Sequence, residues 1–261
     1  MSEDPVRTTR EGRILIVTLD RPKANAIDAA TSRRMGEVFA AFRDDPELRV
    51  AVVTGSGERF FSAGWDLKAA AAGEAPDADF GIGGFGGLQL LPRLDKPVIA
   101  AINGMAVGGG FELALACDLI LAAEHARFAL PEIHAGTLAD AATVKLPRRI
   151  PYHLAMELLL TGRWMDAEEA KRLGIVNEIV PRGRLLARAC ELARTLADGP
   201  PLVFAAIKEV VRETWPLPEQ EALRRIAARA YPTVARLYDS EDQKEGARAF
   251  AEKRPPRWKG R

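Results

Sequence analysis

The stretch that decides the fold runs from Val98 to Leu113 and reads VIAAINGMAVGGGFEL. Its first five residues are apolar and predict a buried strand, and the three consecutive glycines predict the opening of a helix. Glycines let a ligand approach the backbone closely, and the free amides at a helix start favour negative charge. The stretch therefore predicts a turn that could hold an anionic oxygen, although a plain tight connection would have the same pattern.

A second stretch of this kind lies earlier, from Arg59 to Lys68, and reads RFFSAGWDLK. It leads from an apolar segment through Gly64 into a predicted helix, where backbone amides are expected to be exposed. Two such turns together could form an oxyanion hole. Taken alone, this turn is also consistent with an ordinary strand-to-helix connection.

Two glutamates stand close to these turns. Glu112 follows the glycine run, and Glu132 follows Pro131 beyond the next apolar strand. The two carboxylates can meet in space, and apolar neighbours would raise the pKa of at least one of them toward neutrality. We expect Glu112 and Glu132 to act as a general acid and a general base.

In the first half of the chain, predicted β-strands alternate with predicted helices. Apolar runs predict strands at residues 14–19, 50–54, 98–102 and 119–123, and a helix capped by Asp28 is predicted to Arg43. This alternation predicts an α/β fold. The segment from Gly73 to Gly87 is rich in glycine, alanine and aspartate, and it predicts either a mobile loop over a functional site or a tolerated surface insertion.

After Arg182 the pattern is almost wholly helical. Apolar stripes predict helices at residues 185–197, 202–212 and 219–237, and these helices are candidates for subunit packing. We expect an α/β core over residues 1–198 and a helical oligomerisation region over residues 199–261.

Composition excludes several classes of function. The 37 basic and 36 acidic residues leave a net charge of +1, so no nucleic-acid or membrane partner is expected. No signal peptide or transmembrane run is found, and Cys117 and Cys190 stand alone, which indicates reduced thiols in a cytoplasmic protein. Histidines and cysteines lack metal-site spacing, and Phe60 occupies the third glycine position of a dinucleotide motif, so neither a metal nor a dinucleotide is expected.

The two turns and the Glu132 segment, in this order and spacing, resemble the crotonase superfamily, also called the enoyl-CoA hydratase/isomerase family. The similarity covers nearly the whole chain. It implies a spiral of ββα turns with a C-terminal helical trimerisation region, assembled as a homotrimer or a dimer of trimers. It also implies an acyl-coenzyme A thioester as substrate and no separate cofactor. Four further stretches are similar to one group of hydratases within the family: residues 19–28, 65–71, 73–81 and the tail from Phe250.

The resemblance also implies roles for individual residues. The oxyanion amides would come from Trp65 and Gly109, Glu112 and Glu132 would form the catalytic pair, and the Ala63 carbonyl would accept a hydrogen bond from adenine. Phe85 could face the acyl group with Trp65 or Asp79, or these rings could simply pack the pocket wall. The full set of predicted substrate-binding residues is Lys23, Ala24, Ala63, Gly64, Asp66, Leu67, Phe85, Phe250 and Lys253.

One segment departs from the family's pattern. Residues Thr137–Thr143 lack the usual proline and glycine pair and are one residue short, so we expect a rebuilt loop beside the second glutamate. The implied reaction is reversible hydration and dehydration of an acyl-CoA thioester. Double-bond isomerisation is the alternative reaction, and a noncatalytic CoA-binding scaffold is the alternative outside enzymes.

Overall fold

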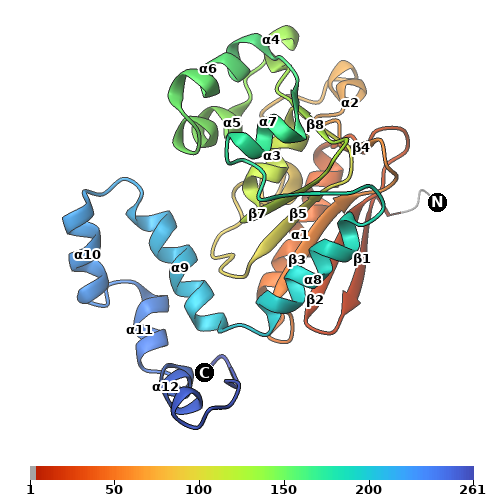
Figure 1. Cartoon of the computed structure of the whole chain (residues 1–261). Coiled ribbons are helices and arrows are strands. Elements are labelled where there is room, and N and C mark those ends of the chain that lie inside the picture. Colours follow the sequence, from red (N-terminus) through yellow and green to blue (C-terminus); the bar gives the residue numbers. More distant parts are fainter. Residues whose placement is uncertain (1–3) are drawn as a thin grey trace.

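The computed structural model describes residues 4–261, which form two sheets and a set of helices (Figure 1). The larger sheet has six strands in the order β1-β2-β3-β5-β7-β10, and the smaller has four in the order β4-β6-β8-β9. The strands are β1 Val6–Glu11, β2 Ile14–Leu19, β3 Val50–Gly55, β4 Phe60–Ser62, β5 Val98–Ile102, β6 Met105–Val107, β7 Leu119–Ala123, β8 Arg127–Ala129, β9 Met165–Asp166 and β10 Glu178–Val180. The expected α/β class and all four predicted strands are confirmed.

Helices cover the sheets and fill the C-terminal region. They are α1 Ala29–Asp44, α2 Leu67–Ala71, α3 Gly109–Ala116, α4 Glu132–Ala135, α5 Asp140–Lys145, α6 Tyr152–Thr161, α7 Ala167–Arg172, α8 Leu185–Ala197, α9 Pro201–Thr214, α10 Glu219–Ala227, α11 Pro232–Tyr238 and α12 Glu241–Ala251. Short 3₁₀ turns lie at η1 Phe85–Gly87 and η2 Leu146–Arg148.

Three successive turns of a spiral organise the core. Each turn places one strand in the larger sheet, the next in the smaller sheet, and then a helix: β3–β4–α2, β5–β6–α3 and β7–β8–α4. Strands β3, β5 and β7 pair in parallel, and so do β4, β6 and β8. This arrangement confirms the predicted spiral of ββα turns, and it brings the starts of α2, α3 and α4 to one edge of the small sheet.

Apolar packing holds α1 against the larger sheet. Met35, Phe39 and Phe42 are buried at helical spacing and join the core with side chains of the central strands. Asp28 caps the helix by accepting a hydrogen bond from Thr31 N at 2.8 Å, as predicted. Both cysteines are free and buried, and burial raises the pKa of the Cys117 thiol to about 12.

The C-terminal helices α9 to α12 extend to one side of the sheets (Figure 1). The single helix predicted over residues 219–237 is wrong, because the chain forms α10 and α11 there with an interruption between them. Pro232 has no amide hydrogen, and Tyr231 before it is extended at φ −96° and ψ 126°. The boundary between residues 198 and 199 falls between α8 and α9, and the assignment of an oligomerisation region stays a prediction.

The glycine-rich segment ends in a packed turn. Gly86 and Gly87 of η1 are buried, and η1 lies against α1 and α3. A Cβ atom on Gly87 would lie 2.5 Å from Gly36 N of α1, so the backbones touch. The segment therefore reaches the start of α3. Among residues 4–261, no helix combines the length and apolar content needed to cross a bilayer.

Candidate active site

The two glycine turns lie in direct contact. Gly64 adopts φ 79°, and a Cβ atom there would lie 2.6 Å from Val107 O and 2.7 Å from Gly109 N. Only glycine fits this conformation and this spacing. The turn after β4 therefore rests against the entrance of α3, as the sequence predicted.

Two backbone amides beside this contact are unpaired within the described chain. In residues 4–261, neither Trp65 N nor Gly109 N donates a hydrogen bond to another protein group. Gly109 is the first residue of α3, where helix geometry leaves the amide without a partner. Ile27 bonds Gly64 O and Asp66 N in a parallel bridge, which turns the Trp65 amide to the other side. The geometry is compatible with the predicted oxyanion hole.

Two side chains that the sequence analysis did not single out, Ser62 and Glu74, hold the Trp65 turn. Ser62 Oγ donates to Asn25 O at 2.7 Å and accepts from Gly64 N at 3.0 Å. Glu74 Oε1 accepts from Trp65 Nε1 at 2.9 Å, and Glu74 Oε2 accepts from Ala29 N at 3.0 Å. These contacts fix the direction of the Trp65 backbone. Only the position of Ser62 two residues before Gly64 signalled such a role.

Glu112 lies on α3 and is held firmly. It is 8% exposed, and its Oε1 accepts a hydrogen bond from Ala142 N at 2.9 Å. Burial raises the pKa of Glu112, while the bond from Ala142 lowers it in part. The Thr137–Thr143 segment lies beside the second glutamate as expected, since Thr137 N donates to Glu132 O at 3.1 Å, and its helix α5 also holds the first glutamate by the hydrogen bond from Ala142 N.

Glu132 is the first residue of α4, and fewer hydrogen bonds fix its carboxylate than fix that of Glu112. Its Oε1 lies against Gly108, where a Cβ atom would be 2.5 Å away, and φ at Gly108 is 53°. Its Oε2 is buried without a hydrogen-bond partner among the described residues. Burial, together with the negative charges of Glu112 and Asp140, raises the pKa of Glu132 to about 7. The two predicted glutamates are therefore electrostatically coupled at the entrance of α3.

Phe85 forms a wall of the same region. Its Cε1 lies 2.3 Å from the place where a Cβ atom of Gly109 would stand, and its ring packs edge-on against Phe80 at 5.4 Å. The ring thus covers the backbone next to the free Gly109 amide. The carboxylate of Asp79 accepts a hydrogen bond from Gly81 N at 2.9 Å and so closes a turn in its own segment.

Most of the predicted binding residues gather at the Gly64 turn. Ala63 N donates to Ala24 O at 3.0 Å, which places Lys23 and Ala24 beside Ala63. Asp66 caps α2, and Leu67, its first residue, is 65% exposed. The structure does not bring Phe250 and Lys253 to this group within one chain. Phe250 lies on α12 and Lys253 follows it, and α12 stands at the end of the C-terminal helical region away from α2 and α3 (Figure 1).

No metal centre is indicated in the described part of the chain. Residues 4–261 contain no group of three or more histidine, cysteine, aspartate or glutamate side chains arranged to hold an ion. The groups that meet at this place are two backbone amides, two carboxylates and an aromatic wall.

Comparison with known proteins gives consistent matches. Residues 9–261 match the family model described as enoyl-CoA hydratase/isomerase. Relatives named carnitinyl-CoA dehydratase, from Citrobacter koseri and Escherichia coli, are 59% and 58% identical over 262 residues, and each alignment covers 100% of both chains. A crystal structure of enoyl-CoA hydratase from Mycobacterium tuberculosis has a TM-score of 0.89 and 41% identity, covering 99% of this chain and 100% of that chain. One from Bacillus anthracis has a TM-score of 0.89 and 32% identity, covering 98% and 100%.

Proposed function

Because this chain belongs to the enoyl-CoA hydratase/isomerase family, we propose that it catalyses the reversible hydration and dehydration of an acyl-CoA thioester. One observation carries the proposal: two neighbouring carboxylates, one with its pKa raised to about 7, lie beside two backbone amides that donate to no group within the described chain. The substrate pair we propose is carnitinyl-CoA and crotonobetainyl-CoA, which agrees with the name of the relatives that are 58–59% identical.

In this mechanism the thioester oxygen accepts hydrogen bonds from Trp65 N and Gly109 N. These bonds stabilise the enolate and make the β-carbon of the unsaturated thioester electrophilic, and one such donor is typically worth about 2.7–4 kcal/mol. One glutamate takes a proton from the attacking water, and the other delivers a proton to the α-carbon. Dehydration reverses these steps, so each group must be able to hold and to release a proton near neutral pH.

The raised pKa of Glu132 suits this exchange. A carboxyl group with a pKa of about 7 is present in both protonation states at neutral pH. Glu112, which also has a raised pKa and is fixed by Ala142 N, is positioned as its partner. No cofactor beyond the coenzyme A of the substrate is required in this scheme.

The activity is tested by mixing the purified protein with crotonobetainyl-CoA, crotonyl-CoA and a 3-enoyl-CoA and following ultraviolet absorbance. Hydration removes the conjugated double bond, so absorbance falls with the first two substrates. Conversion of the 3-enoyl-CoA alone, with rising absorbance, would instead identify an isomerase. A failure to change any of the three thioesters while still binding them would identify the scaffold alternative.

The isomerase alternative is favoured by one observation. Glu132 Oε2 lacks a hydrogen-bond partner among residues 4–261, and a single carboxylate with a pKa of about 7 suffices to shuttle a proton between two carbons. Hydration needs a second carboxylate to orient water. The hydrogen bond that holds Glu112 supports hydration as the first proposal.

The acyl preference depends in this proposal on Phe85. Crotonobetaine carries a permanent trimethylammonium group, which has no donor hydrogens and is recognised by aromatic faces or carboxylates. Since cation–π attraction is worth about 0.5–2 kcal/mol, Phe85→Leu should lower the ratio of kcat/KM for crotonobetainyl-CoA over crotonyl-CoA by roughly 2- to 30-fold. An unchanged ratio would remove the carnitine-specific assignment and leave a general enoyl-CoA hydratase.

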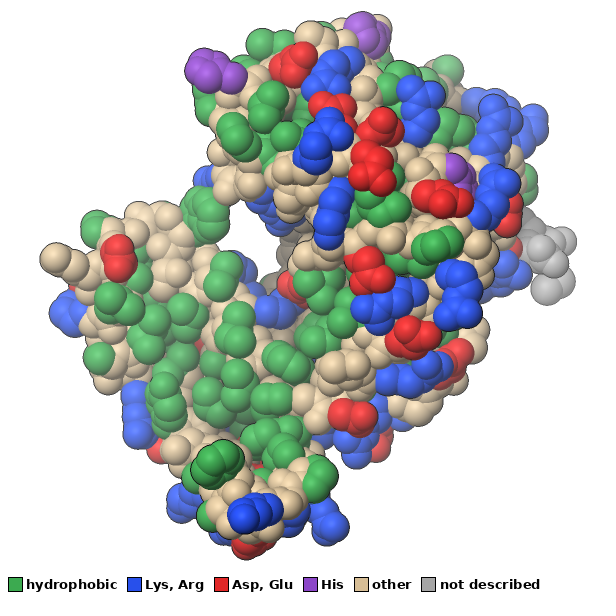
Figure 2. Space-filling model, in the orientation of Figure 1, with side chains coloured by type: hydrophobic (Ala, Val, Ile, Leu, Met, Phe, Trp, Pro, Cys, Tyr) green, Lys and Arg blue, Asp and Glu red, His purple; other side chains and the backbone are tan. Residues whose placement is uncertain are grey.

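We also propose a cytoplasmic homotrimer or dimer of trimers without nucleic-acid or membrane partners. The C-terminal helices carry many exposed apolar side chains, which gather over one face (Figure 2). Among them are Ile207, Val211, Trp215, Leu223, Tyr238 and Phe250. Burial between subunits would remove these side chains from water. It would also allow Phe250 and Lys253 to reach the nucleotide of a neighbouring subunit's substrate.

A further inference from the structure

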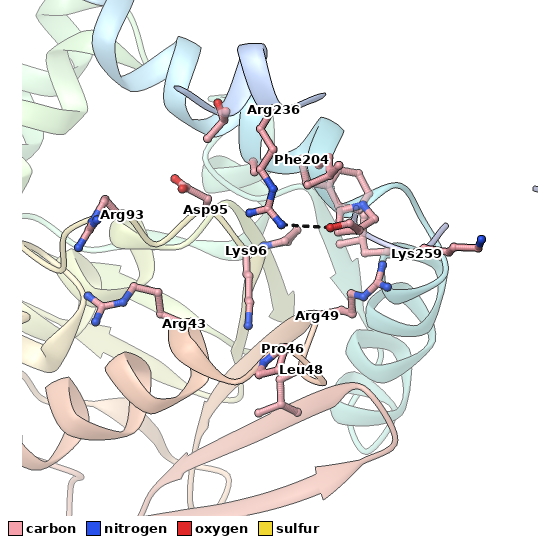
Figure 3. A pocket seen from close by; sticks show the side chains of 17 residues that line it. Arg43, Pro46, Leu48, Arg49, Arg93, Asp95, Lys96, Phe204, Arg236 and Lys259 are labelled. Carbon is pink, nitrogen blue, oxygen red and sulfur yellow. Dashed lines mark hydrogen bonds between the residues drawn. The ribbon is translucent and has the colours of Figure 1, made fainter. Parts of the chain in front are cut away.

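A cavity of about 380 Å³ lies far from the two glutamates, where the core meets the C-terminal helices (Figure 3). Its walls come from the residues before β3, the residues before β5, the starts of α9 and α11, and the C-terminal segment. Strands β3 and β5 run parallel, so these walls stand at the amino-terminal ends of the strands. The helix that carries Glu112 follows the carboxyl end of β5, so the cavity is separate from the candidate active site.

The cavity is strongly basic, although the whole chain carries a net charge of only +1. Six basic side chains line it: Arg43, Arg49, Arg93, Lys96, Arg236 and Lys259. Its single acidic side chain, Asp95, already pairs with Arg212 at 3.4 Å. The positive charge inside the cavity is therefore not neutralised by its own walls.

Four of these cations have no carboxylate partner within the described residues. Arg43 pairs with Asp44, and Lys259 pairs with Glu241. The remaining four form no ion pair with any residue from 4 to 261: Arg49, Arg93, Lys96 and Arg236. Three of them use carbonyl oxygens instead, among them Lys96, which donates to Phe42 O at 2.7 Å, and Arg236, which donates to Gly260 O at 3.1 Å.

Among these four cations, Arg49 has the strongest need for a further hydrogen-bond acceptor. Its Nη1 is buried and has no hydrogen-bond partner in the described chain, and its Nη2 reaches only Trp258 O at 3.4 Å. Burial, together with the nearby charge of Arg13, lowers the pKa of Arg49. A buried charged donor without a partner is costly, and a bound ion or water at the open side of the cavity would satisfy it. Figure 3 shows Arg49 at the cavity wall near the C-terminal segment.

We propose that this cavity binds an anion of the phosphate class, with Arg49 as its principal contact. The planar guanidinium group offers paired donors that match phosphate oxygens, and Arg236 and Lys96 lie across the cavity to supply further charge (Figure 3). Phe204, Pro46 and Leu48 form an apolar part of the wall that could cover a flat organic group. The volume is at the lower end of small-ligand pockets. The anion is either inorganic diphosphate or the diphosphate of a nucleotide.

Isothermal titration calorimetry of the full chain at constant ionic strength tests the proposal. Three probes are used: inorganic pyrophosphate, ADP and adenosine. We expect pyrophosphate and ADP to bind and adenosine not to bind, because the charge carries recognition. Tighter binding of ADP than of pyrophosphate would identify a nucleotide as the source of the phosphate, and equal binding would identify the inorganic anion.

Substitutions of single basic residues show where pyrophosphate binds. Arg49→Gln should weaken pyrophosphate binding by about tenfold or more, the usual loss for a charge-assisted hydrogen bond. Arg236→Gln, an exposed position, should weaken it as well and guards against a folding defect at Arg49. Lys23→Gln removes the same charge at the proposed thioester site and should leave the affinity unchanged, so the result does not depend on the proposed function.

Several outcomes would overturn the proposal. One is equal pyrophosphate affinity in the wild type, Arg49→Gln and Arg236→Gln. Another is loss of binding in Lys23→Gln alone, which would place the anion at the thioester site. A third is the absence of any heat with pyrophosphate and ADP while Arg49→Gln changes the sedimentation coefficient, which would show that a second copy of the chain fills the cavity.

Discussion

The two halves of the candidate site treat their carboxylates in opposite ways. Glu112 lies within a helix of eight residues, is 8% exposed and is fixed by Ala142 N at 2.9 Å. Glu132 begins a helix of only four residues, and its Oε2 is buried with no hydrogen-bond partner in the described part of the chain. Burial raises the pKa of both, and backbone hydrogen bonds lower each in part, from the Ala142 and Ala141 amides at Glu112 and from the residue's own amide at Glu132.

The difference shows how the surroundings within one site can give two glutamates different acid–base properties. A fixed carboxylate with a hydrogen bond is suited to orient a water or a substrate, whereas an unpaired one changes its protonation state easily. Four experiments test this comparison, from the largest expected effect to the smallest.

The largest effect is expected at Gly109, because its amide is a proposed oxyanion donor on which the action of both glutamates depends. Gly109→Pro removes an amide aimed at the thioester oxygen and adds a ring where Phe85 already lies, so kcat should fall by about 10³-fold or more. Turnover of crotonobetainyl-CoA or crotonyl-CoA measures the loss, and circular dichroism checks the fold. Full activity in a folded variant would show that Gly109 is not a donor.

The glutamates themselves come next. Glu112→Gln and Glu132→Gln keep the shape of each side chain but remove its acid–base function, so each should lower kcat by roughly 10²-fold or more. Thioester binding, measured by calorimetry with an unreactive acyl-CoA, should persist in both. If both variants turned over at near-normal rates, the glutamate-pair mechanism would be wrong.

A smaller loss of activity is expected from a substitution at Gly108, which would displace only Glu132. A Cβ atom at Gly108 would lie 2.5 Å from Glu132 Oε1, and alanine is disfavoured at φ 53°. Gly108→Ala should therefore displace Glu132 and lower kcat by roughly tenfold, with little change in the KM of the thioester. A matched control is Gly57→Ala, which also has positive φ but no atom within 4 Å of its added Cβ. Equal losses in both variants would show that backbone strain, and not Glu132, is responsible.

The smallest effect concerns stability. The pKa of Glu132 is raised from 4.5 to about 7, so between these values the folded chain keeps a proton that the unfolded chain releases. The stability linked to protonated Glu132 is complete below pH 4.5 and is lost as the pH rises through about 7. Glu132→Gln cannot ionise, so it should exceed the wild type by about 1–2 kcal/mol at pH 8 and match it more closely at pH 5.

Urea unfolding of both proteins at the two pH values measures this difference. Glu112→Gln is the comparison variant, because its amide oxygen can still accept from Ala142 N while the ionisable group is removed. A Glu132→Gln variant that is no more stable than the wild type at pH 8 would contradict the raised pKa of Glu132.

Much of the site could be predicted from the sequence because its signals are local. The apolar run 98–102, the glycines from Gly108 and the acidic residue after them specify a strand, a tight turn and a helix start within a few residues. The strand, the turn and the helix lie where the sequence placed them. The same holds for the cap at Asp28, where one side chain bonds an amide three residues on.

Other features were decided only by the tertiary structure, because they depend on residues distant in the chain. No local pattern told which segment would hold Glu112, since Ala142 N comes from α5, 30 residues away. The break between α10 and α11 was missed because apolar periodicity continued across Pro232, whose backbone restriction prevailed over the pattern. The raised pKa of Glu132 and the orphaned Nη1 of Arg49 are likewise products of burial, and burial follows from how separate elements pack together.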